Sequence, residues 1–275
     1  MERVKQVDKK SLIIIITYVI TAIFWLCLTL KTPDPESRAG YYLQIFLFLI
    51  PLFGSIVGFM NARLWGGFRS AVGRAIIFLS LGTLTWAIGM LIWNYYIFLA
   101  KVEIPYPSIA DLAFILSWPL WTIGFIELSK ATGARFALRK IKGRVLLTVI
   151  PLAVIFASYY LLIDIARDGV IEWSTGGLKL FFDLFYPIGD VVILTVALML
   201  FSLSYNFLGG RYRSAVWMLI AAFILNYFSD FLFSYTTTKE TYFNGHFVDF
   251  LFATTMFVLS LGLSMLDVKL LNKSK

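Results

Sequence analysis

The chain has few of the residues from which metal, disulfide and catalytic sites are usually built. It contains one cysteine, Cys27, and one histidine, His246, in 275 residues. A disulfide within one chain is therefore excluded, and a His/Cys zinc site is not expected. The sequence has no HExxH motif, phosphate-binding glycine loop, nucleophile elbow or Ser-His-Asp set. We expect no enzymatic activity, and no particular cofactor or metal is indicated.

Charge is also scarce. Charged residues make up 15% of the chain, 60% of residues are hydrophobic and the mean hydropathy is +0.82. A soluble domain carries about 25% charged residues. Apolar runs of about 20 residues recur, which is the length that crosses ~30 Å of hydrocarbon. The sequence therefore predicts an all-α integral membrane protein, whose first partner is the lipid bilayer.

Eight transmembrane helices are expected, joined by short loops that leave no room for a soluble domain. Their predicted ranges are 12–30, 41–60, 75–99, 110–128, 145–165, 179–203, 215–235 and 246–266. The charged N-terminus followed by an apolar run resembles a signal peptide. The run is long and no clear cleavage site follows, so we expect an uncleaved first helix.

Lysine and arginine predict the orientation. With a cytoplasmic N-terminus, 18 of the 24 basic residues fall in inner segments and six in outer ones. Cytoplasmic loops of membrane proteins carry such an excess. Both termini are therefore expected in the cytoplasm, with the protein in the cell (cytoplasmic) membrane. The net charge of +8 comes from these short loops, so it does not indicate nucleic-acid binding.

An internal repeat is visible. The segments GGFRSAV (66–72) and GGRYRSAV (209–216) each follow a helix containing a proline, Pro51 or Pro187. Each precedes an aromatic-rich helix and then an outer helix start with an aspartate, Asp111 or Asp249. We expect two parallel four-helix repeats, residues 1–140 and 141–275, in one compact membrane domain. An even number of helices per repeat implies a pseudo-twofold axis along the membrane normal.

Two of the carboxylates stand at predicted helix starts. Ser108 and Asp111 have the spacing of a capping box, in which the third helical residue reaches back to the N-cap. Asp249 follows His246 by three residues, and a carboxylate in a first turn also interacts favourably with the helix dipole. Both acids are therefore explained by helix capping as well as by ligand binding.

The acids deeper in the helices are harder to explain by capping. Asp183 and Asp190 are seven residues apart, which places them on one helix face. Asp190 lies about 16 Å from Lys179 along a helix, where a charge costs at least ~2.5–3.5 kcal/mol. Asp230 follows Asn226 by four residues. No lysine or arginine lies near the middle of a span, so these acids must be protonated, hydrogen-bonded, hydrated or bound to a cation.

These positions predict one outward-facing acidic cavity for a cation, a proton or a small cationic ligand. The expected ligand-binding residues are Asp111, Asp183, Tyr186, Asp190, Asn226, Asp230, His246 and Asp249, with Trp86 and Asn94 in the wall. Satisfied polar packing is the alternative for the acids. Anchoring at the membrane interface is the alternative for the aromatic residues.

The segments PYPSIADLAFILSWP and FYPIGDVVIL resemble membrane sensory regions found ahead of GGDEF and EAL domains in bacterial signalling proteins. The first family motif is matched by Pro105, Pro107, Ser108 and Asp111, and the second by Tyr186, Pro187, Gly189 and Asp190. In addition, Asp230 matches a family aspartate that commonly follows a small residue, here Ser229. The resemblance implies a sensory function. No cyclase, phosphodiesterase or kinase domain is present in the chain, so a signal would pass to a partner.

The inner loop at residues 129–144 carries six positive charges. It is expected to orient the protein and contact anionic lipid, and it is a candidate docking surface for a cytoplasmic signalling partner. We interpret the chain as a receptor-like or ligand-binding membrane protein. The alternative is a cation- or proton-coupled transporter, and an enzyme acting on lipid is the weakest of the three hypotheses.

Overall fold

The structure is a computed structural model that describes residues 9–31, 38–131, 141–170, 177–204 and 213–268. This part of the chain is helical, without strands. Eight of its helices are long and apolar enough to cross a membrane, which makes the chain a multi-pass membrane protein. The predicted number of spans is confirmed.

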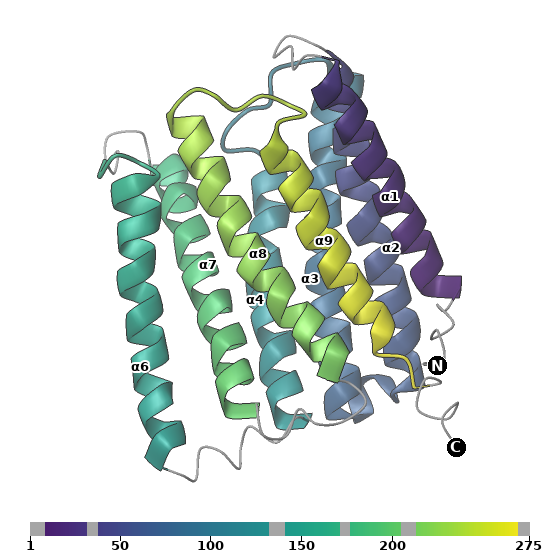
Figure 1. The fold of residues 1–275 in the computed structure, drawn as a ribbon, viewed down its shortest axis with the longest axis vertical. Coiled ribbons are helices and arrows are strands. Elements are labelled where there is room, and N and C mark those ends of the chain that lie inside the picture. The colour runs from purple at the N-terminus through teal and green to yellow at the C-terminus, as the bar shows by residue number, and fades with distance from the viewer. Residues whose placement is uncertain (1–8, 32–37, 132–140, 171–176, 205–212, 269–275) are drawn as a thin grey trace.

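The long helices, with the short helices that extend or join them, follow the predicted order (Figure 1). They are α1 (Lys9–Leu30), η1 (Arg38–Tyr42), α2 (Leu43–Leu64), η2 (Gly67–Arg69), α3 (Ala71–Asn94), η3 (Tyr95–Ala100), α4 (Ile109–Ala131), α6 (Ile141–Ser158), η4 (Tyr159–Ile165), α7 (Gly177–Ser204), α8 (Arg213–Thr238) and α9 (Phe247–Met265).

Several helices extend a few residues beyond the predicted apolar runs, and at α3 a polar residue caps the added turn. At the start of α3, Ser70 accepts a hydrogen bond from the backbone N–H of Gly73 at 2.9 Å. The segments η3 and η4 are π-helical, and each begins with two tyrosines. Apolar periodicity gave no sign of these wider turns.

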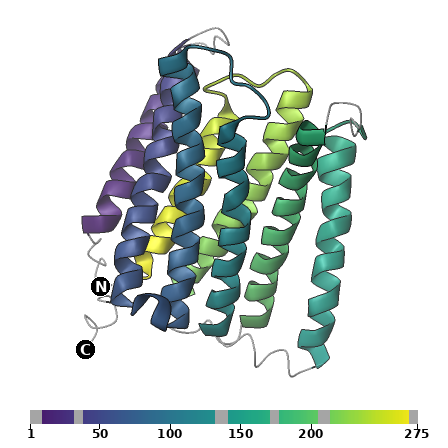
Figure 2. The same cartoon turned by 180° about the vertical axis from the view of Figure 1, so that it is seen from behind.

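Six helices form a closed ring. In it α2 packs against α3, α3 against α4, α4 against α7, α7 against α8, α8 against α9, and α9 against α2. Outside the ring, α1 lies against α2 and α9, and α6 lies against α7. Figures 1 and 2 show the bundle from its two sides, with α1 and α6 at opposite edges. Within the ring, the first four long helices meet the last four mainly at the α4–α7 and α2–α9 contacts, and α1 adds a contact with α9 outside it.

Aromatic residues fill the interior of the ring. Trp121, Phe125 and Phe223 are fully buried, and Phe223 meets the two α4 rings edge to face with centroids 5.1 and 5.0 Å apart. Close approach of α3 to α4 depends on Gly82, where a Cβ atom would lie 2.5 Å from the Trp121 ring. Small residues at such contacts are typical of membrane helices, which associate by close packing.

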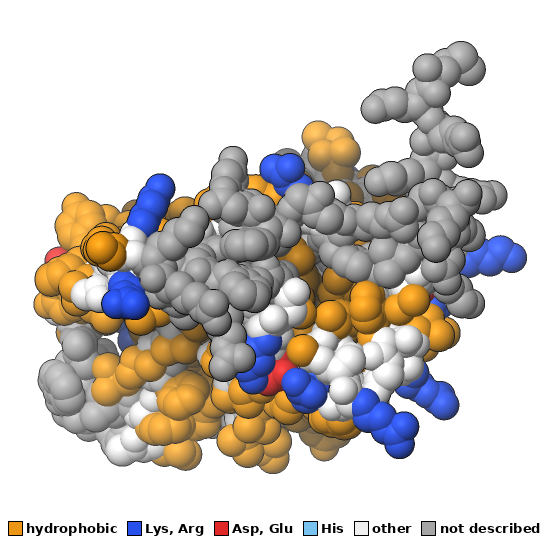
Figure 3. All heavy atoms as spheres, turned by 90° about the horizontal axis from the view of Figure 1, so that it is seen from below, with side chains coloured by type: hydrophobic (Ala, Val, Ile, Leu, Met, Phe, Trp, Pro, Cys, Tyr) orange, Lys and Arg blue, Asp and Glu red, His pale blue; other side chains and the backbone are white. Residues whose placement is uncertain are grey.

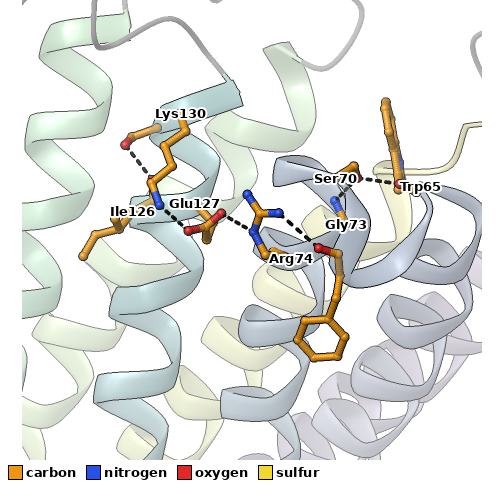
Figure 4. A network of polar contacts seen from close by, with 9 residues as sticks. Trp65, Ser70, Gly73, Arg74, Ile126, Glu127 and Lys130 are labelled. Atoms are coloured by element: carbon orange, nitrogen blue, oxygen red, sulfur yellow. Dashed lines mark hydrogen bonds and ion pairs between the residues drawn. The ribbon is translucent and has the colours of Figure 1, made fainter.

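One end of the bundle is rich in basic side chains; we call it the basic end, and Figure 3 looks onto it. The described ends of the chain meet there, because Lys10 of α1 forms a 3.2 Å ion pair with Asp267, just past α9. Figure 4 shows a second network at this end, where Glu127 of α4 binds Lys130 of the same helix and Arg74 of α3. Helices α2, α4, α7 and α9 begin at the opposite end.

Candidate functional site

Helices α7 and α8 bring two of the predicted acids together. Asp190 is the fourteenth of the 28 residues of α7 and only 2% exposed. Asp230 of α8 is partly buried, and the two carboxyl groups hydrogen-bond to each other. We call these two residues the acid pair. At 1.5 Å of rise per residue, Asp190 lies about 20 Å along α7 from Gly177.

Two N–H donors complete the described surroundings of the acid pair. The amide Nδ2 of Asn226 donates to Oδ2 of Asp230 at 2.6 Å, and Asn226 also hydrogen-bonds to Asp190. Across the α4–α7 junction, the indole Nε1 of Trp118 donates to Oδ1 of Asp190 at 3.2 Å. Trp118 and Asn226 are 4% and 2% exposed, so these bonds form in a setting screened from solvent.

The contact between the two carboxyl groups has a chemical consequence. An ionised carboxylate only accepts hydrogen bonds, so a hydrogen bond between two carboxyl groups requires that one of them carries a proton. Two ionised carboxylates in contact would also repel each other strongly at low dielectric. None of the described partners is a lysine or arginine. The pair as it stands therefore holds at least one proton.

A second polar contact crosses the same junction closer to the helix starts. The hydroxyl of Tyr186 donates to Oδ1 of Asp111 at 2.8 Å. The other oxygen of Asp111 accepts the backbone N–H of Ser108 at 2.7 Å and its hydroxyl at 2.9 Å. The predicted capping contact is therefore confirmed, and Asp111 has a second role between helices. The Trp118 ring packs edge to face on Tyr186, with centroids 5.3 Å apart, and so connects the two contacts.

Asp249 belongs to a different group of contacts. It is 2% exposed and accepts three hydrogen bonds, from Gln44 Nε2 at 2.9 Å, the Tyr242 hydroxyl at 2.8 Å and the Gly245 N–H at 2.7 Å. Asn94 joins this group by donating to the backbone oxygen of Gln44 at 3.0 Å. These bonds fix the start of α9 and the preceding loop to α2, as expected of an acid in a first turn.

The predicted site residues thus fall into two groups of contacts rather than one. The first contains Asp111, Tyr186, Asp190, Asn226 and Asp230; the second contains Asn94, His246 and Asp249. Trp86 is 6% exposed and packs on Phe114 of α4 and Phe252 of α9, neither of which belongs to either group. The side chain of Asp183 lies outside the described part of the chain.

His246 lies among aromatic rings in the loop before α9. Its ring is 4.4 Å from that of Phe247 and 5.1 Å from that of Phe243, centroid to centroid. Its Nδ1 atom is buried without a described hydrogen-bond partner. Burial lowers the pKa of His246, because the imidazolium form would lose hydration. Burial and the neighbouring Asp249 raise the pKa of Tyr242 well above its ordinary value.

Sequence reasoning missed Trp118, Gln44 and Tyr242. For Trp118 a usable signal was present, because it follows Asp111 by seven residues and therefore shares its face of α4. Tyr186 and Asp190 share a face of α7 in the same way. Gln44 and Tyr242 are polar residues at the edges of apolar runs, and nothing in their spacing connects them to Asp249.

In the described residues, no group of three or more His, Cys, Asp and Glu side chains is placed to hold a metal ion. Comparison of the chain with protein-family models, curated proteins and solved structures finds no match. The function has to be argued from the two groups of contacts themselves.

Proposed function

We propose that this protein is a receptor-like membrane protein that binds a proton or a small cation at the acid pair. The observation that supports this most strongly is the contact of Asp190 with Asp230 in the middle of the bundle, without a basic partner among the described residues. Acidic residues inside a membrane are costly and are usually functional. A structural hydrogen bond at this place needs no acid, since asparagine and serine side chains serve as well.

The proposed orientation places both termini in the cytoplasm and the starts of α4, α7 and α9 at the outer face of the cell membrane. The basic end then faces the cytoplasm, in agreement with the usual distribution of lysine and arginine. In this orientation Asp111 and Tyr186 lie between the acid pair and the outer surface. We therefore expect the stimulus to arrive from outside.

The same proposal includes two parallel repeats, residues 1–140 and 141–275. The helix packing supports it, because α1 lies against α2 as α6 lies against α7, and the ring order α2–α3–α4 corresponds to α7–α8–α9. The acids break the symmetry, since α2 and α3 contain none. The ligand site is therefore a specialisation of the second repeat.

As a sensor, the protein would pass its signal to a cytoplasmic partner. The resemblance to membrane sensory regions ahead of GGDEF and EAL domains supports this reading. So does α4, which carries Asp111 near one end, Trp118 near its middle and Glu127 near the other end, where Arg74 binds Glu127 at 2.7 Å. Residues 129–144 follow directly, and we propose this basic segment as the docking surface.

The first test is the melting temperature of the purified protein against pH and a panel of cations, beside Asp190→Asn. A ligand that binds only the folded state raises the melting temperature. We expect the wild type to respond to pH or to one cation and the variant to lose the response. A wild type that responds to neither would show that the acid pair is a packing contact and that the proposal is wrong.

A cation- or proton-coupled transporter is the second candidate. It is favoured by the position of the acid pair near mid-membrane and by Pro187 inside α7, one turn from Asp190, since transporter sites combine such acids with interrupted helices. Uptake of a labelled substrate, driven by a proton or sodium gradient into vesicles containing the protein, would favour the transporter. Neither reading requires enzymatic activity.

A further inference from the structure

We propose that the ligand of the acid pair is a proton rather than a metal cation, and that Tyr186 and Asp111 carry it between the pair and the end of the bundle where α4 and α7 begin. This inference rests on the proposed function and specifies it further. It depends on two observations, which are the chemistry of the groups around the pair and the row of polar contacts along the α4–α7 junction.

The groups around the acid pair suit a proton. Apart from the two carboxyl groups, its described partners are the indole N–H of Trp118 and the amide N–H groups of Asn226. N–H donors turn their positive hydrogens toward the carboxyl oxygens and so occupy the lone pairs that a metal cation would need. Sodium, magnesium and calcium sites are instead built from several oxygen ligands. A single proton shared by two carboxyl groups satisfies all four residues.

The route follows from the position of Tyr186. It precedes Asp190 by one helical turn, its hydroxyl donates to Asp111 at 2.8 Å, and its ring packs on Trp118, which itself donates to Asp190. A tyrosine hydroxyl both donates and accepts a hydrogen bond, so it can pass a proton from one acid to another. Asp111 is the third residue of α4 and is 5% exposed, so it lies at the end of the bundle where α4 begins.

Two other titratable groups lie beside this route. Tyr227 of α8 lies within electrostatic reach of Asp190, and its hydroxyl donates to Ser158 of α6 at 2.9 Å. Tyr106, in the loop before α4, lies within reach of Tyr186. The acidic side chains along the route are Asp111, Asp190 and Asp230.

Infrared spectroscopy of the full chain in lipid vesicles tests the ligand directly, because a protonated carboxyl group has its own C=O stretching band. We expect a band that titrates with pH, is lost in both Asp190→Asn and Asp230→Asn, and is the same in sodium chloride and choline chloride. Asp249→Asn is the matched control, since Asp249 is an equally buried acid outside the pair. We expect this control to retain the band.

The route is tested by the rate at which the same band appears after a rapid drop in pH. We expect Tyr186→Phe to slow this rate several-fold, because it removes only the hydroxyl that binds Asp111 next to the acid pair. Tyr242→Phe removes the corresponding hydroxyl from Asp249 and is expected to leave the rate unchanged. An unchanged rate in Tyr186→Phe would overturn the route.

The outcomes separate this inference from the function on which it rests. A titrating band that sodium or another metal ion displaces would show that the site binds a metal; the receptor proposal would stand and the proton assignment would be overturned. Absence of any band that depends on Asp190 or Asp230 would also overturn it. A protein whose melting temperature responds to neither pH nor cations would overturn both proposals.

Trp118→Phe serves as a second probe if an acid variant does not fold. Loss of the indole N–H bond to Asp190 is expected to shift the pH midpoint of the carboxyl band.

Discussion

Asp111 and Asp249 occupy the same position in two helices, the third residue of α4 and of α9, and each accepts a tyrosine hydroxyl at 2.8 Å. Both acids also accept a backbone N–H from the residues just before their helix. The surroundings then differ, since Tyr186 comes from another helix of the bundle and Tyr242 from the loop before α9. One motif therefore joins α4 to α7 in the first case and closes a loop in the second.

The three hydrogen bonds that Asp249 accepts predict different losses of stability for variants of Asp249 and of Tyr242. Asp249→Ala leaves Gln44 Nε2, the Tyr242 hydroxyl and the Gly245 N–H without their buried acceptor. Each unsatisfied group costs about 1–3 kcal/mol, so we expect a loss of several kcal/mol in the free energy of unfolding. Tyr242→Phe removes one donor and should cost about 1 kcal/mol. Denaturant unfolding in detergent measures both, and equal losses in the two variants would contradict the assignment.

The close contact of α7 with α4 is tested at Gly189. A Cβ atom there would lie 2.7 Å from the Trp118 ring, so Gly189→Ala must displace the indole or separate the helices. Overpacking of this kind typically costs about 1–3 kcal/mol. Because Trp118 also binds Asp190, we expect the pH response of the melting temperature to shift as well.

Gly177→Ala is the control for this experiment. Gly177 begins α7, and a Cβ atom there meets nothing within 4 Å. Alanine is the better helix former by about 1 kcal/mol in a helix interior, so at the first residue we expect no loss of stability. A Gly189→Ala variant as stable as Gly177→Ala would show that the α4–α7 contact is looser than described.

How much of this could be read from the sequence differs between fold and site. The eight helices and the capping box at Ser108 were predictable, because apolar length and cap spacing are local properties of the chain. The pairing of Asp190 with Asp230 was not, since it depends on which helices become neighbours and how they rotate. Trp118, which also binds Asp190, was missed because a tryptophan in an apolar run more often packs in the core or lies at the membrane interface than belongs to a polar site. The division of the site residues into two groups also depends on which helices become neighbours, and no spacing specifies it.

The contact between Lys10 and Asp267 gives a third prediction. Lys10 donates to Asp267 at 3.2 Å and to Oδ1 of Asn61 at 3.1 Å, and Asp267 is 2% exposed. Lys10→Met removes a cation from a buried carboxylate, a change that is strongly destabilising when the partner stays charged. We expect Lys10→Met to lower the melting temperature more than the double variant Lys10→Met/Asp267→Asn does. A double-mutant cycle measures the coupling, and simple additivity of the two changes would contradict it.

His246 gives a prediction in pH. Its pKa in the folded protein is lowered by burial, so the unfolded chain takes up a proton first as the pH falls. Stability from the neutral imidazole is therefore fully present above about pH 6.5, the unfolded pKa, and is lost as the pH falls toward the folded pKa. In the Asp190→Asn background, which removes the response of the acid pair, we expect the free energy of unfolding to decrease between about pH 7 and 5. Adding His246→Gln should flatten this decrease, because glutamine does not titrate. An identical slope with and without the histidine would mean that another group, and not the imidazole among the Phe243 and Phe247 rings, controls stability in this range.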